Sequence, residues 1–264
     1  MNLAAAAQSS IGRKIISGLT GFLLMGFVVG HLTGNFLLLV GPDAFNNYAY
    51  FLEHMFHGAG LKIAELGLTV LFLSHAWSGY SVWSNKQKAR KSGYAVSQSA
   101  GGNSKKSFSS TNMMITGVLL LLFVVWHVLQ FKFGIIDTAN RDVVVDGVAM
   151  RDLYGLVIDT FSTFVWTGVY LIIMTALGVH LWHGAWSAFQ STGLANGKYL
   201  PTLHKAAHVI AVVLALGFLA LPTIVLLANE RFQKLDDQYM EKYKVVTSIE
   251  NPSASTLDTT EKGA

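Results

Sequence analysis

The sequence predicts an all-α membrane protein in which five transmembrane helices form a bundle. The first observation is composition: hydrophobic residues make up 52% of the chain and charged residues 13%, about half the charged fraction of a soluble domain. The second is that five stretches approach or exceed the roughly 20 apolar residues needed to cross a bilayer. Such stretches form helices in lipid, because every backbone polar group must be paired within the segment.

The five expected spans are almost free of charge. In chain order they cover roughly residues 15–40, 63–83, 112–131, 160–190 and 206–229. The one ionised side chain inside them is Glu65, near the start of the second span, and Pro222 lies near the end of the fifth. Residues 1–229 are therefore expected to form a five-helix domain. Residues 230–264 form a polar tail, and we expect its end, 251–264, to be disordered.

Loop charges predict the orientation of the bundle. The loop between the second and third spans has six basic residues and no acid: Lys86, Lys88, Arg90, Lys91, Lys105 and Lys106. The loop from 132 to 159 instead has five aspartates against three basic residues. The positive-inside rule then places the N-terminus and the basic loop in the cytoplasm and, after five spans, the C-terminus outside. The serine-, glycine- and lysine-rich stretch 92–110 is typical of a flexible loop.

Each of the first four spans contains a histidine: His31, His75, His127, and, in the fourth, both His180 and His183. Ionisable side chains inside a membrane are costly and usually functional. Because the chain has no cysteine, disulfides, thiolate-held clusters and thiol nucleophiles are excluded.

The depths of these histidines sort them into two pairs. At 1.5 Å per residue, His75 and His180 lie about 16 and 15 Å from the cytoplasmic ends of their spans, whereas His31 and His127 lie about 27 and 22 Å from theirs. This arrangement is typical of two haems stacked across the membrane, each bound by two imidazoles from different helices. Bis-histidine iron has no open coordination position and suits electron transfer.

Two other kinds of site compete with the haem hypothesis. A zinc or copper site needs three or four ligands at one depth, and a proton-relay transporter usually adds intramembrane carboxylates. The histidines divide into two pairs at different depths, which disfavours a zinc or copper site. The spans contain almost no acidic residues, which disfavours a proton-relay transporter. His180 and His183 face roughly one side of the helix, so depth alone leaves the ligand of the fourth span open.

Small and polar residues surround His31. Gly26, Gly30 and Gly34 recur every four residues on one face of the first span, which favours either a close helix–helix contact or space for a haem. Asn35 lies one turn beyond His31 and is a candidate to bind a haem, a quinone or a neighbouring helix.

Taken together, these residues resemble the cytochrome b membrane-anchor subunit of diheme succinate:quinone oxidoreductases, a family that includes fumarate reductases of the same build. The resemblance covers residues 13–227. Its most specific parts are the ordered histidines, "HLTGNF" from His31, "DAFNNYAYFLEH" after the first span, and "HLWHGAWS" in the fourth.

The resemblance implies which histidines bind iron. It pairs His75 with His180 at the inner haem b, and His31 with His127 at the outer haem b, as the depths also indicate. In the family, the fourth-span ligand precedes a glycine by four residues, which here is Gly184, so the resemblance selects His180. His183 is then expected to contact a haem propionate or a partner subunit, with simple packing as the alternative.

The resemblance also implies a quinone site near the outer haem. Glu53 matches the family's carboxylate, which exchanges a proton with the quinone; a water-facing Glu53 is the alternative. Some fumarate-reducing members have a glutamate two residues before the fourth-span ligand, where this chain has Gly178. This difference favours succinate oxidation. His204 and His208, beside Lys205 at the start of the fifth span, are candidates to contact haem propionates or the iron–sulfur partner, with anchoring at the membrane interface as the alternative.

The expected function is therefore that of a respiratory complex II subunit serving the tricarboxylic acid cycle in the inner (cytoplasmic) membrane. It would pass electrons from an iron–sulfur subunit, docked with an FAD-containing flavoprotein, through two haems b to a quinone, with menaquinone the family-based expectation. The chain has no flavin-binding glycine fingerprint, so it is not the succinate-oxidising subunit. The alternatives are a cytochrome b subunit of another respiratory enzyme, such as a hydrogenase or formate dehydrogenase, and a transporter without haem.

Overall fold

The computed structural model describes residues 8–88, 108–136, 142–145, 147–195 and 197–250. The expected disorder of 251–264 and most of the expected flexible loop at 92–110 lie outside these residues. The end of that loop is described, and it forms the short helix α5 (Phe108–Thr111).

The five expected spans are confirmed as helices long and apolar enough to cross a membrane. They are α2 (Ser10–Asn35) with the 3₁₀ turn η1 (Phe36–Leu39), α4 (Ala59–Lys88), α6 (Met113–His127) with the π turn η2 (Val128–Lys132), α8 (Phe164–Ser191) and α9 (Leu200–Leu227). The chain is thus a multi-pass membrane protein. The structure divides into two compact units, the first formed by 1–33, 62–126 and 168–220, and the second by 34–61, 127–167 and 221–264.

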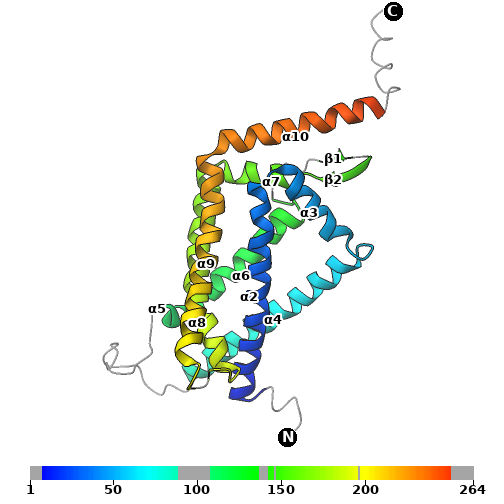
Figure 1. The fold of residues 1–264 in the computed structure, drawn as a ribbon. Helices are drawn as coiled ribbons and strands as arrows, with labels where there is room; N and C mark the ends of the chain where they lie inside the picture. The colour runs from blue at the N-terminus through cyan, green and yellow to red at the C-terminus, as the bar shows by residue number, and fades with distance from the viewer. Residues whose placement is uncertain (1–7, 89–107, 137–141, 146, 196, 251–264) are drawn as a thin grey trace, which may run out of the picture. The chain divides into compact units, whose positions relative to one another are not determined.

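The first unit contains the greater part of all five long helices. Figure 1 shows α2, α8 and α9 running side by side, and small residues allow their close approach. A Cβ built on Gly178 of α8 would lie 2.9 Å from the Cβ of Ala215 on α9, and one on Gly18 of α2 would lie 3.0 Å from the Cβ of Ser191 on α8. Small residues at helix contacts are typical of membrane bundles, where the lipid is as apolar as the side chains.

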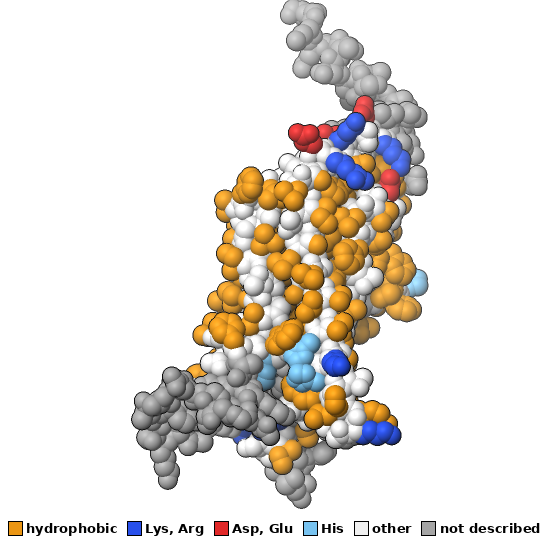
Figure 2. All heavy atoms as spheres, turned by 60° about the vertical axis from the view of Figure 1, so that its left-hand side comes forward, with side chains coloured by type: hydrophobic (Ala, Val, Ile, Leu, Met, Phe, Trp, Pro, Cys, Tyr) orange, Lys and Arg blue, Asp and Glu red, His pale blue; other side chains and the backbone are white. Residues whose placement is uncertain are grey.

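The outward faces of these helices are apolar. Figure 2 shows hydrophobic side chains over most of the visible length of the bundle. On α4, for example, Ile63, Leu66 and Leu73 are all more than half exposed. Apolar side chains on the surface of a helix that could span a bilayer are expected to face lipid.

The second unit contains the remaining elements: α3 (Pro42–His54), the strands β1 (Asp142–Val145) and β2 (Val148–Arg151), α7 (Leu153–Phe161) and α10 (Asn229–Glu250). The two strands pair antiparallel, with Val145 opposite Val148. Gly147 has φ = 77°, a value that favours glycine and suits the tight turn of a hairpin. This hairpin is a small addition to the all-α class that the sequence predicts.

The polar tail begins as the helix α10, which packs within the second unit. Its Tyr239 and Tyr243 form a buried cluster with Val143, Val145 and Met150 of the hairpin. The hydroxyl of Tyr243 also donates a hydrogen bond to Asp43 Oδ1 of α3, at 2.7 Å. The tail therefore covers the apolar face of the hairpin.

A buried polar network joins α3 to α7. The side-chain amide of Asn46 donates to Asp152 Oδ1 at 2.9 Å, and its carbonyl accepts from the backbone N–H of Tyr154 at 2.8 Å. Asp152 caps α7 by accepting from the Gly155 N–H at 3.0 Å. All of these groups are buried, so each lost bond would leave a partner without water to replace it.

The fourth span begins later than the sequence predicts. Residues 160 and 161 end α7 rather than open the span, and α8 starts at Phe164. Both Thr160 and Ser162 bond backward to carbonyls of α7, at 2.8 and 2.7 Å. Apolar content alone predicts one continuous span here, whereas these bonds help to end α7 before α8 begins.

Candidate functional site

His75 and His180 come together inside the first unit, as the sequence predicts for the inner pair. Their rings, from α4 and α8, have centroids 6.3 Å apart and planes inclined by 73°. His183 lies three residues further along α8, and no ring contact joins it to His75 among the described residues. The structure therefore favours His180 over His183 as the partner of His75.

Each ring of this pair has its Nδ1 engaged. His75 Nδ1 lies 3.2 Å from the backbone carbonyl of Ser17 and 3.3 Å from Thr20 Oγ1 on α2. His180 Nδ1 lies 3.1 Å from Thr116 Oγ1 on α6. The Ser17 carbonyl only accepts, and both threonine hydroxyls can donate to carbonyls of their own helices. The proton is therefore on Nδ1 of His75, and the contact with Thr116 Oγ1 is compatible with the same tautomer in His180.

This tautomer leaves the lone pair of each Nε2 available to a metal ion. Metal-bound histidines nearly always donate their other N–H to an oxygen, which fixes the tautomer and the ring orientation. Bonds from a metal to an imidazole nitrogen are about 2 Å long, and Nε2 lies about 1 Å from the ring centroid when ring bonds are about 1.3 Å. Two imidazoles on opposite sides of one ion therefore have centroids about 6 Å apart. The separation of His75 and His180 fits this requirement.

Glycines face both rings. A Cβ on Gly21 of α2 would lie 3.3 Å from His75 Cε1, and one on Gly117 of α6 would lie 3.5 Å from His180 Cε1. A side chain at Gly21 would thus press on the ring edge. Neither glycine, nor Thr20 or Thr116, was identified from the sequence as part of the site.

His31 of the predicted outer pair also belongs to the first unit. It is half-buried on α2, where its ring stacks on Phe27 and Phe218 with centroids 5.5 and 6.1 Å away. A Cβ on Gly26 or Gly30 meets no described atom within 4 Å, so these glycines do not make the close helix contact that their spacing allows. Both glycines are exposed on α2.

His127 of the predicted outer pair belongs to the second unit. It is the last residue of α6, where the α-helix passes into the π turn η2, and its ring lies 5.1 Å from that of Phe131. Single π turns within α-helices are frequent at functional sites. The pairing of His31 with His127 joins separate units and stays a prediction.

Arg151 is a polar residue of the second unit that the sequence analysis did not single out. Its Nη1 donates to the carbonyls of Phe131 and Lys132 at 2.7 and 3.1 Å, at the end of η2. Its Nη2 is buried and has no hydrogen-bond partner among the described residues. A buried donor without an acceptor costs about 1–3 kcal/mol, so the position suits an oxygen atom of a ligand.

Glu53, the predicted quinone carboxylate, lies in the last turn of α3 and is exposed. Its negative charge acts on Arg151. Burial lowers the pKa of the Arg151 guanidinium, and the charges of Asp142 and Glu53 oppose that shift. The second unit thus places a carboxylate and an incompletely bonded guanidinium in electrostatic range of each other. Such a pair can supply a proton and a hydrogen bond to a quinone.

The other predicted residues are placed as follows. Asn35 ends α2. His204 is exposed and His208 half-buried on α9. Among the described residues, no three His, Cys, Asp or Glu side chains are grouped as ligands of a metal ion.

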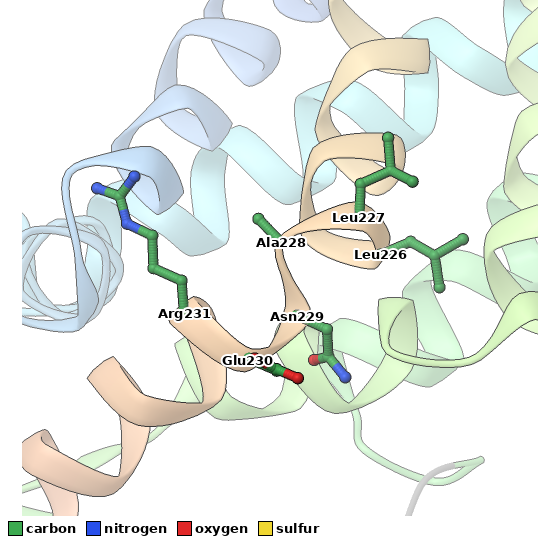
Figure 3. Close-up of a pocket in the computed structure, with 6 residues that line it drawn as sticks. All are labelled: Leu226, Leu227, Ala228, Asn229, Glu230 and Arg231. Atoms are coloured by element: carbon green, nitrogen blue, oxygen red, sulfur yellow. The ribbon is translucent and has the colours of Figure 1, made fainter.

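One pocket of about 460 Å³ lies where α9 ends and α10 begins. It is lined by six consecutive residues, 226–231, none of them a histidine. Figure 3 shows their side chains pointing in different directions from the chain. They do not converge on a common point, and we assign the pocket no role.

Comparison with known proteins adds no relative: no family model, no curated protein and no solved structure matches this chain significantly.

Proposed function

We propose that this chain is the membrane-anchor cytochrome b subunit of a succinate:quinone oxidoreductase. The observation that carries the proposal is the pair His75 and His180, which come from different helices with ring centroids 6.3 Å apart and Nδ1 atoms engaged. Bis-histidine haem b supplies one-electron transfer. In this account the pair holds the inner haem, and His31 and His127 hold the outer one.

The chain's own residues prepare the inner site. Thr116 contacts His180, and the Ser17 carbonyl with Thr20 contacts His75, so that each Nε2 would be the atom that holds a shared ligand. Gly21 and Gly117 leave the rings room to keep that orientation. Hydrogen bonds at Nδ1 make each imidazole a stronger ligand. These features, together with the ordered histidines and the motifs in the sequence, support the cytochrome proposal.

Glu53 and Arg151 are proposed to serve the quinone. Arg151 donates a hydrogen bond from Nη2 to a quinone oxygen, and Glu53 exchanges a proton with that oxygen as its charge changes. We further propose that the N-terminus lies in the cytoplasm and the C-terminus outside, in the inner membrane. The iron–sulfur subunit and the FAD-containing subunit dock on the cytoplasmic side, and menaquinone is the proposed acceptor.

The test is to identify the electron donor of the haems. The tagged chain is purified from its native membranes with any bound subunits, and succinate, formate or hydrogen is added while the absorption of the b haems is followed. Reduction by succinate, with a flavoprotein and an iron–sulfur protein in the preparation, supports the proposal. Reduction by formate or hydrogen alone shows instead a cytochrome b subunit of another respiratory enzyme.

A further inference from the structure

Four aromatic rings form a ladder between α8 and α9, apart from the histidine pair. The ring of Trp186 lies 4.6 Å from that of His204, His204 lies 4.3 Å from His208, and His208 lies 4.0 Å from Trp182. His208 Nδ1 donates to the His204 carbonyl at 2.8 Å. All four rings belong to the first unit, and Figure 2 shows a patch of histidine side chains below a broad hydrophobic area.

An apolar stripe continues from this ring ladder along α9. Lys205 is exposed beside His204, and Val209, Val212 and Leu216 follow at helical spacing on the same face, 60%, 42% and 60% exposed. From residue 209 to residue 216 the helix rises about 10 Å. One leaflet of a bilayer has a hydrocarbon layer of about 15 Å. The stripe is therefore short enough to lie against the acyl chains of one leaflet.

The charge of this region is positive only. The sequence contains no Asp or Glu from residue 160 to residue 229, while Lys198 and Lys205 lie there. Tryptophan prefers the membrane–water interface, and basic pockets between transmembrane helices bind anionic head groups. A cation beside interfacial rings, followed by an exposed apolar stripe, is complementary to an anionic amphiphile.

We propose that the α8–α9 pair binds one anionic phospholipid. Its phosphate lies at Lys205 beside the ring ladder, and its acyl chains lie along Val209, Val212 and Leu216. A free phosphate would not contact the stripe, and a peripheral protein would not reach side chains that lie within the hydrocarbon layer. The proposal is independent of the haem assignment, because it rests on the exposed face of α8 and α9.

Native mass spectrometry of the purified full-length chain tests this site, with phosphatidylglycerol and phosphatidylcholine of identical acyl chains as probes. Both lipids have a phosphate and the same chains, but only phosphatidylglycerol has a net charge. We expect the first phosphatidylglycerol to bind about fivefold more tightly, the effect of about one lysine charge near a membrane surface. Lys205→Gln removes this preference, whereas Lys205→Arg keeps it.

The matched control is Lys86→Gln, which removes another exposed lysine, from the last turn of α4; the preference is expected to survive. Equal binding of the two lipids to the wild-type chain, or an unchanged preference in Lys205→Gln, overturns the proposal. Displacement of phosphatidylglycerol by equimolar glycerol phosphate would show a simple anion site and also overturn it. One further outcome would overturn it: Lys205→Gln keeps the lipid preference but no longer copurifies with peripheral subunits that accompany the wild-type chain. Lys205 would then serve a protein contact.

Discussion

Thr116→Val perturbs the inner histidine pair without touching either ring. Valine keeps the shape of threonine but lacks the hydroxyl oxygen that lies 3.1 Å from His180 Nδ1 and that we assign as the acceptor of its N–H. Thr116 is buried, and stranding a buried donor costs about 1–3 kcal/mol. Loss of such a second contact to a metal ligand typically lowers metal affinity about 10–100-fold. We expect haem affinity at this site to fall within that range.

The same substitution is expected to raise the midpoint potential of one haem. The hydrogen bond makes the imidazole more basic, which favours ferric iron, so its loss favours the reduced state. A tenfold change in the relative stability of the two states corresponds to about 59 mV for one electron. A rise of tens of millivolts in a spectroelectrochemical titration is the expected result.

A second threonine provides an internal comparison. His75 Nδ1 lies within hydrogen-bond distance of both the Ser17 carbonyl and Thr20 Oγ1. Thr20→Val therefore leaves one acceptor in place and is expected to change the haem potential less than Thr116→Val does. Thr175→Val is the control, because within the part of the chain that the structure describes the Thr175 hydroxyl bonds only a carbonyl of its own helix. Equal haem potentials in Thr116→Val, Thr175→Val and the wild type would refute the proposed contact between Thr116 and an iron ligand.

Three further predictions test the histidine choice, the fold of the second unit and the quinone carboxylate. His180→Ala is expected to lose one of two haems while His183→Ala keeps both, as counted from the pyridine haemochrome spectrum; the reverse result would make His183 the ligand. Asn46→Ala removes two buried hydrogen bonds and is expected to cost about 2–4 kcal/mol, seen as a lower thermal unfolding temperature, whereas exposed Asn47→Ala changes it little. Glu53→Gln is expected to lower the rate of quinone reduction at least tenfold, since an acid–base group contributes about 10²–10⁴-fold, with haem content unchanged; an unaltered rate would exclude the proton role.

The sequence predicts the long helices well because their signal is composition. An uncharged apolar run of about 20 residues has few alternatives in lipid, and the histidines within such runs are visible at once. Helix ends are weaker signals. The break at 162–163 depends on side chains that bond back to α7, and hydropathy does not register such bonds.

The hairpin of the second unit has a local sequence signal. The stretch "VVVDGVAM", from Val143 to Met150, has an Asp-Gly pair between β-branched or apolar residues, a strong hairpin signal. Its aspartate was counted only toward the charge of an outer loop. The contacts of Asn46 and Arg151, in contrast, have no local sequence signal. They join residues 106 and 19–20 positions apart, and no local pattern specifies which distant groups meet.

The residues that contact the histidine pair could not be predicted from the sequence either. Thr20 and Thr116 are two among many hydroxyl residues in the spans, and a threonine in a transmembrane helix usually bonds its own backbone. Only the packing of α2 on α4, and of α6 on α8, distinguishes them. The sequence can therefore indicate candidate ligands by depth, but not the residues that contact them.

The central claim is that four histidines hold two haems, and haem stoichiometry tests it most directly. The purified chain from haem-replete cells is assayed by pyridine haemochrome and by its reduced-minus-oxidised spectrum. The account predicts two b haems per chain. One haem would show that one histidine pair is structural, and a folded, colourless chain would contradict the cytochrome assignment and favour a transporter without haem.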